Sequence, residues 1–323
     1  KVESNYCIND LIRHTAKSII ATVEGTGSRV SFYSFSDDAN EITDLTTITP
    51  DNREVIMDAI DTIKPCGGTN IWKGCRAAIK KLVCRADKSR NPAIILLTDG
   101  QPNQGPNKTE NDAITLVYNK LPVEWDCGES LIGRIPITTI GFGYSLKKDL
   151  MYDIARDTGG INASVPDGSM MATVFSNALA NILNTRSYST ILHIEIPNAK
   201  QFKIGAGGNE SALIDTALPY SIKHLESGAV EIQIRIGSLQ FEQDRDIIVN
   251  LKSITEESDD IKYWVSYCQG NNKCETPKGT ILDMSSLGDI NSDIECELLR
   301  EYCCRQLQLI KRDRLRGINP HQR

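Results

Sequence analysis

A short apolar run at residues 93–98, Ala-Ile-Ile-Leu-Leu-Thr, leaves this chain few choices of fold. Asn91-Pro92 precedes the run and Asp99-Gly100 follows it, and both pairs favour turns. A strand that is apolar at nearly every position, rather than at every second one, is typical of a parallel sheet covered on both faces. We therefore expect a buried parallel strand between two layers of helices.

The segments on either side of this run predict the same architecture. Apolar residues recur at helical spacing in one set of segments and mark strands in another. The expected helices are 6–22, 52–63, 70–84, 111–121, 147–156 and 168–184, and the further strands are 29–35, 41–48 and 135–142. Strands that alternate with helices indicate an α/β fold with a doubly wound, mostly parallel sheet and helices on both faces.

The pattern changes near Arg186, where strands separated by turns begin. In Ala229–Gly237 apolar and polar residues alternate strictly, which predicts one buried and one wet face. With further strands expected at 190–196, 246–254 and 261–267, the region predicts a β-sandwich-like domain. Residues 276–290 are expected to form a linker and 291–316 a helix. The predicted domains are therefore 1–185, 186–275 and 276–323.

Composition excludes some classes of function. The net charge of -6 argues against a nucleic-acid partner, because the chain has no basic surplus to neutralise phosphates. No apolar run approaches the roughly 18 residues of a membrane span. The sequence starts at Lys1 without an initiator Met, so we interpret it as part of a longer product.

The ten cysteines include no CxxC pair, which argues against a common structural zinc site. We expect reduced thiols in a cytoplasmic protein. A secreted protein is the alternative, and in that case Cys268 and Cys274 could pair across the polar loop between them.

Two loops carry residues suited to a hard cation. Asp99 follows the strand at 93–98, and ligands of open α/β sheets bind at the carboxyl ends of strands. Gly67 and Gly68 permit a tight turn just before Thr69, whose hydroxyl is a neutral oxygen donor. Each loop also has an ordinary explanation, because Thr69 could cap the helix that follows it and Asp99-Gly100 could be a plain turn.

Taken together, these motifs resemble the von Willebrand factor A family. The resemblance covers about residues 1–185 and rests on the order of four segments: the helix at 6–22, Val30–Ala39, Gly67-Gly68-Thr69-Asn70-Ile71, and Ile94–Gly100. It implies a Rossmann-like sheet and a metal-ion-dependent adhesion site. Thr69 and Asp99 match two ligands of that site, while Gly67, Gly68, Gly100 and Asp38 would support it.

The resemblance also shows what is missing. The family's third ligand segment, D-x-S-x-S, is absent from this sequence. In the family it follows a central first strand, just before the helix at 6–22. We therefore expect a gap between the strands at 29–35 and 93–98, and weak binding or none of Mg²⁺ (or of Mn²⁺ or Ca²⁺).

The implied function is protein binding. An Asp or Glu of a protein partner would complete the coordination of the metal, without enzymatic turnover. The alternative is a scaffold with a vestigial site in a larger ubiquitin-ligase-type or other multidomain protein, because the β-rich region loosely resembles the one in intracellular members of that kind. Secreted inter-alpha-trypsin inhibitor heavy chains have a similar two-part layout.

Two enzyme classes compete with this interpretation. A nucleotide-binding enzyme would need G-x-G-x-x-G or G-x-x-x-x-G-K-[ST], and a serine hydrolase of the α/β type would need G-x-S-x-G. None of these motifs occurs. His193 lies on the strand face opposite Leu192 and Ile194, where we expect a paired or solvent-facing histidine.

Overall fold

The computed structural model describes residues 8–87, 89–99, 101–103, 135–143, 146–165, 170–197, 214–215, 218, 220–242, 247, 250–251, 261–270 and 272–280. The chain divides into two compact units. The first takes in Lys1–Thr190, Gly237–Phe241 and Tyr267–Cys274, and the second takes in Ile191–Ile236, Glu242–Ser266 and Glu275–Arg323. The predicted domain boundaries at residues 185 and 275 stay predictions.

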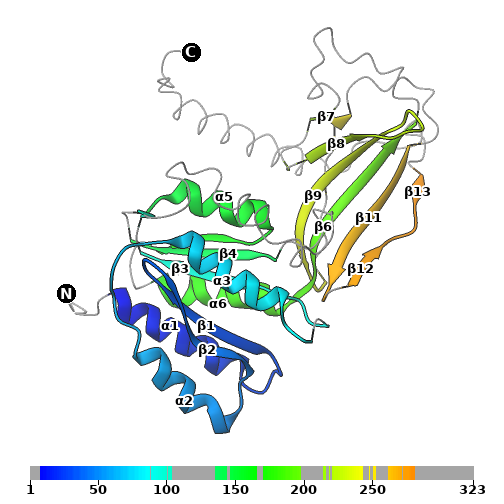
Figure 1. Cartoon of the computed structure of the whole chain (residues 1–323). Helices are drawn as coiled ribbons and strands as arrows, with labels where there is room; N and C mark the ends of the chain where they lie inside the picture. Colours follow the sequence, from blue (N-terminus) through cyan, green and yellow to red (C-terminus); the bar gives the residue numbers. More distant parts are fainter. Residues whose placement is uncertain are drawn as a thin grey trace, which may run out of the picture. The chain divides into compact units, whose positions relative to one another are not determined.

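The first unit contains the parallel sheet that the apolar run predicts (Figure 1). Strand β3 (Ile94–Thr98) pairs in parallel with β4 (Ile137–Phe142), which pairs in parallel with β5 (Asn162–Val165). Every residue of β4 is buried, as expected for a central strand covered on both faces. The prediction of an α/β fold is therefore confirmed.

The helices of the first unit lie within a few residues of the predicted segments. They are α1 (Ile8–Val23), α2 (Pro50–Asp61), α3 (Ile71–Val83), α5 (Lys148–Thr158) and α6 (Met171–Leu183). Pro50 stands in the first turn of α2, where a missing N–H breaks no helical hydrogen bond. Helix α5 ends at Gly159, whose φ of 78° is left-handed and suits glycine. The predicted helix at 111–121 lies outside the described residues.

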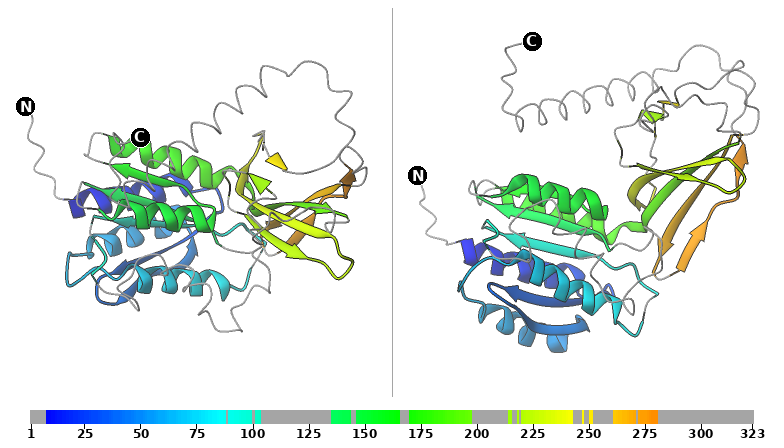
Figure 2. Two further views of the ribbon diagram at one scale, coloured as in Figure 1. Left: turned by 90° about the horizontal axis from the view of Figure 1, so that it is seen from above. Right: turned by 45° about the horizontal axis from the view of Figure 1, so that its top comes forward.

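Strands β1 (Arg29–Phe35) and β2 (Ala39–Thr47) form an antiparallel pair at the predicted positions. In the described part of the chain, no ladder joins β1 to β3. Yet both strands contribute to the same hydrophobic clusters: Phe32 and Leu97 pack with α1 and α6, and Phe35 packs with Leu96, α3 and α5. The two strands therefore lie in one layer between the same helices (Figure 2). The predicted gap between them stays a prediction.

The second unit contains most of a sheet with the strand order β12-β11-β6-β9-β8, and β13 also pairs with β11. The strands are β6 (Thr185–Ile196), β8 (Tyr220–His224), β9 (Val230–Gln240), β11 (Lys262–Gln269), β12 (Asn272–Glu275) and β13 (Gly279–Thr280). Separately, β7 (Ile214–Asp215) pairs with β10 (Asn250–Leu251). The predicted helix at 291–316 and most of the strand predicted at 246–254 lie outside the described residues.

The apolar face of this sheet is a hydrophobic cluster that includes Ile194, Ile232 and Ile234. The opposite face corrects the prediction of a wet surface, because His193 and Gln233 are only 5% and 7% exposed. Both side chains bind the Glu231 carboxylate, and hydrogen bonding of this kind offsets the cost of burying polar groups.

No cysteine in the described residues forms a disulfide, Cys268 and Cys274 included. Hydrogen bonds between Val265 and Thr276 set the register of β11 and β12. Because side chains alternate along a strand, this register places Cys268 and Cys274 on opposite faces of the pair. The disulfide considered for a secreted protein is therefore not formed in this structure. Within the described residues, no helix has the length and apolar character needed to cross a membrane.

Candidate metal-binding site

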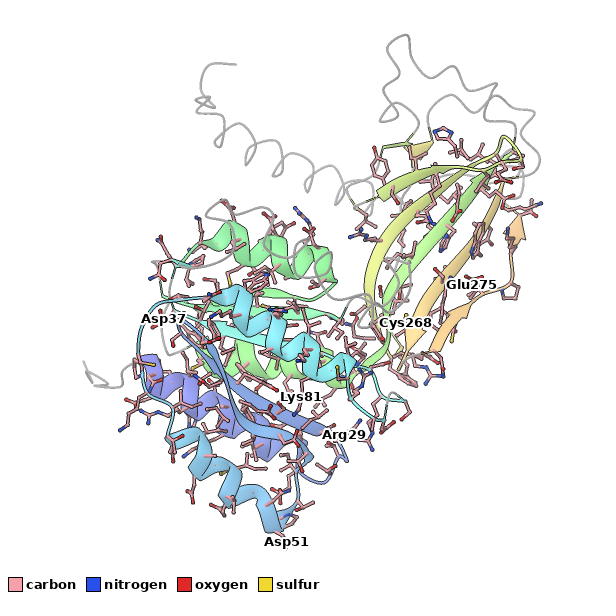
Figure 3. All side chains as sticks on the ribbon, in the orientation of Figure 1. Arg29, Asp37, Asp51, Lys81, Cys268 and Glu275 are labelled. Carbon is pink, nitrogen blue, oxygen red and sulfur yellow. The ribbon has the colours of Figure 1, made fainter. Side chains whose placement is uncertain are left out.

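Three segments of the first unit meet where β1 ends and α3 begins. The backbone N–H of Asn70, just before α3, donates to the carbonyl of Ser36, just after β1, at 2.8 Å. The backbone N–H of Asn103, in the segment after β3, donates to the carbonyl of Thr69 at 3.2 Å. The predicted Thr69 loop is therefore bonded both to the end of β1 and to the segment that carries Asp99. Figure 3 labels Asp37, which lies close to the end of β1.

The Gly67-Gly68 turn is built around the side chain of Asp37. Oδ1 of Asp37 accepts the backbone N–H of Gly68 at 2.7 Å. Gly67 has a φ of +65°, and a Cβ added there would lie 2.7 Å from Oδ2 of Asp37. Both the left-handed backbone and the close carboxylate favour glycine at position 67.

Hydrogen bonds to Asn103 involve the backbone of Thr69 but not its hydroxyl. Oδ1 of Asn103 accepts the backbone N–H of Thr69 at 2.8 Å, which complements the bond from the Asn103 N–H to the Thr69 carbonyl. The Thr69 side chain is half-buried, and its hydroxyl makes no hydrogen bond to the rest of the described chain.

The N-cap of α3 is Asn70, not Thr69. Asn70 is 5% exposed, and its Oδ1 accepts the backbone N–H of Lys73 at 3.1 Å. The alternative explanation of Thr69 as a helix cap is therefore wrong. Thr69 stands one residue too early, and the neighbouring amide takes the role.

The predicted acidic residues have different surroundings. Asp99 is exposed directly after β3, and Gly100 lies outside the described residues. Asp38 lies beside Lys73, with 3.2 Å between Oδ1 and Nζ, and its Oδ1 also accepts the backbone N–H of Ala39. The hydrogen bond from Ala39, together with Lys73, holds the pKa of the Asp38 carboxyl below its usual value. The structure thus places Asp37, rather than Asp38, against the glycine turn.

The donors that this region offers suit a hard cation but do not complete a site. Thr69 has a hydroxyl oxygen and Asp99 a carboxylate, both of which are ligand types that Mg²⁺ and Ca²⁺ prefer. Across the described residues, no group of three or more His, Cys, Asp or Glu side chains could hold a metal ion. Within the described residues, Thr69 and Asp99 are therefore two predicted ligands, and their role stays a prediction.

Sequence reasoning assigned no role to Asn70 or Asn103 and favoured Asp38 over Asp37. The only signal for Asp37 was its place directly after a strand whose end lies near the loop. Asn103 follows Asp99 by four residues, within reach of the same loop, but nothing in its sequence context singles it out.

The second unit contains a serine, a histidine and a glutamate in hydrogen-bonded order. Nδ1 of His193 lies 2.6 Å from Oε1 of Glu231, and Nε2 contacts Oγ of Ser266. The ring of Trp264 stacks on the imidazole. Ser266 is completely buried, so its hydroxyl cannot meet a substrate in this conformation. The histidine is paired, which is one of the two expected environments, and the arrangement stabilises the sheet.

Comparisons with known proteins show what this chain is similar to. Residues 8–177 match the family model of the von Willebrand factor type A domain. The chain is 26% identical over 149 residues to inter-alpha-trypsin inhibitor heavy chain H3 of Mesocricetus auratus and 28% identical over 131 residues to heavy chain H4 of Homo sapiens. These alignments cover 44% and 38% of this chain but only 16% and 13% of the two relatives.

Solved structures show a similar fold. The protein described as von Willebrand factor type A from Catenulispora acidiphila matches with a TM-score of 0.59 over 84% of this chain and 61% of that chain. The sequence identity is 13%, so this likeness concerns the fold alone.

Proposed function

The chain belongs to the von Willebrand factor type A domain family, and we propose that it is a protein-interaction module that binds its partner through a divalent cation. Thr69 and Asp99 are the ligands that this chain would supply. A carboxylate from an Asp or Glu of the partner would take a further position on the cation. Binding of this kind makes and breaks no covalent bond, so the proposal contains no enzymatic step.

The free hydroxyl of Thr69 is the observation that carries this proposal. Asn70 caps α3, and the side chain of Asn103 accepts the backbone N–H of Thr69. The Thr69 hydroxyl is therefore available to a ligand. It belongs to a loop bonded to the segment that follows Asp99. If Thr69 were the N-cap of α3, its hydroxyl would accept a backbone N–H of the first helical turn.

Mg²⁺ is the proposed cation, with Mn²⁺ or Ca²⁺ as alternatives. When bound, it would supply a Lewis acid that attracts the partner's carboxylate. The sequence contains no D-x-S-x-S segment, and Mg²⁺ usually keeps several waters. We therefore expect weak metal binding when Thr69 and Asp99 act alone.

A scaffold with a vestigial site, within a larger ubiquitin-ligase-type or other multidomain protein, is the second candidate. The observation that favours it is that, in the described part of the chain, no group of three or more His, Cys, Asp or Glu side chains could hold a metal ion. The two candidates differ in one measurable property, which is whether a divalent cation binds at Thr69 and Asp99.

Titration with Mn²⁺ tests the proposal. Mn²⁺ broadens the NMR signals of nearby nuclei, so we expect selective loss of the backbone amide signals of residues 68–70 and 99. Asp99→Ala should weaken this effect by about tenfold or more, because it removes the charged ligand. Asp44→Ala is the matched control, since it removes the same charge from an exposed carboxylate that pairs with Lys81. Equal broadening in all three proteins would refute the proposed site.

We propose a cytoplasmic location, with secretion as the alternative. The ten cysteines include no CxxC pair, and reduced thiols are typical of cytoplasmic proteins. Mass spectrometry of the protein from its native cells, without reductant, would test this. A disulfide between any two of these cysteines would contradict it.

A further inference from the structure

Two side chains that are not proposed metal ligands hold the Thr69 loop from different segments. Asp37, two residues after β1, accepts the backbone N–H of Gly68 at 2.7 Å. Asn103, in the segment after β3, accepts the backbone N–H of Thr69 at 2.8 Å. With the bond from Asn70 to Ser36, three successive N–H groups of the loop are bonded to residues outside it.

These bonds fix the backbone of the loop that leads into α3. The N–H groups of Gly68, Thr69 and Asn70, which precede the helix, are all bonded to Asp37, Asn103 and Ser36. None of these bonds uses the Thr69 hydroxyl, and a hydroxyl oxygen suits a hard cation.

Asn103 joins the segments of both proposed ligands. It follows Asp99 by four residues and bonds the N–H and the carbonyl of Thr69 at once. Any movement of the Thr69 loop away from the Asp99 segment would break both bonds. We infer that Asn103 and Asp37 are the positioning residues of the metal site, which fix the Thr69 hydroxyl relative to Asp99. This inference rests on the proposed function.

The physical reason is preorganisation. A divalent cation binds tightly only where its oxygen donors already stand at suitable separations, and the residues that orient these donors typically account for about tenfold or more in metal affinity. The carboxylate of Asp37 also fills the space beside Gly67, where a Cβ would lie 2.7 Å from Oδ2. The turn therefore depends on this side chain as well as on glycine.

The test compares Asn103→Leu with Asn103→Asp, because aspartate keeps an oxygen that can accept the Thr69 N–H and leucine does not. Gln101→Ala, at an exposed position in the same segment, is the control. Hydrogen exchange of the Thr69 amide is measured first, without metal. We expect it to be roughly fivefold faster in Asn103→Leu, and near the wild-type rate in Asn103→Asp and Gln101→Ala.

The same proteins are then titrated with Mn²⁺. We expect the dissociation constant to rise by about tenfold in Asn103→Leu, to stay unchanged in Gln101→Ala, and to stay equal or fall in Asn103→Asp. A parallel pair, Asp37→Ala and Asp37→Asn, should show the same contrast at the Gly68 amide.

The outcomes separate the two proposals. If the wild-type chain binds no Mn²⁺, the proposed function fails, and amide exchange still decides whether Asn103 holds the loop. If Mn²⁺ binds but Asn103→Leu changes neither the exchange of Thr69 nor the affinity, the proposed function stands and the positioning role is overturned. Faster exchange with an unchanged affinity would also overturn it, because Asn103 would then hold the loop without serving the metal.

Discussion

Three cysteines follow one another at equal intervals in the sequence but differ in solvent exposure: Cys66, Cys75 and Cys84. Cys75 lies on the buried face of α3 and is 2% exposed, whereas Cys66 and Cys84 are exposed. Burial raises the pKa of the Cys75 thiol to about 12, because the protein interior disfavours the thiolate. The thiolate is the reactive form, so these residues should differ in reactivity.

We expect iodoacetamide at pH 8 to alkylate Cys66 and Cys84 in the native protein and to leave Cys75 unmodified. At this pH the Cys75 thiol stays protonated, since its pKa lies well above the solution pH. Mass spectrometry of tryptic peptides reads out each position. Unfolding in urea is the control and should make Cys75 react. Modification of native Cys75 as fast as of Cys66 would show that α3 opens readily.

Thr69 shows how far a single residue's role can be predicted. Asp99 follows a strand, at the edge of an α/β sheet where ligands bind, and the family resemblance implied that the Thr69 loop belongs to the same site. It could not decide which residue caps α3, because Thr69 and Asn70 are both favourable caps. Whether Asp37 or Asp38 contacts the glycine turn depends on the conformation of the turn after β1. A turn has no repeating apolar pattern from which side-chain directions could be predicted.

At the scale of an element, helix α3 depends on its cap. Asn70→Ala should lower the free energy of unfolding by about 1 kcal/mol, because the N–H of Lys73 loses its acceptor. Asn70→Asp should retain most of the stability, since a carboxylate accepts the same bond and favours the positive end of the helix dipole. Urea denaturation followed by circular dichroism measures both. An alanine variant as stable as the wild type would mean that the cap contributes nothing.

The elements were predicted well where one face alone is buried. Apolar spacing located α1, α3 and β9 within a few residues. Whether a polar face is buried or exposed was harder to predict, because it depends on residues of neighbouring strands. His193, Glu231 and Ser266 lie on different strands, and no periodicity within one strand could show that they meet and bury one another.

At the scale of the whole molecule, strand β3 has no partner, among the described residues, on the side away from β4. Ile94 donates its N–H to the carbonyl of Pro136, on the β4 side. Because neighbours along a strand point in opposite directions, the N–H groups of Leu96 and Thr98 also face β4, while those of Ile95 and Leu97 face β1. Within the described residues, no strand pairing between β1 and β3 provides acceptors for the N–H groups of Ile95 and Leu97.

This edge predicts an alternating pattern of hydrogen exchange. We expect the amides of Ile95 and Leu97 to exchange at least about tenfold faster than those of Ile94 and Leu96, since only the latter are held by the ladder. NMR-detected exchange resolves each amide. Strand β4 supplies the control, because it has a partner on both sides and its amides should be uniformly slow. Equal protection along β3 would mean that another segment already pairs with its open edge, and the weak metal binding expected of this chain would then have to be reconsidered.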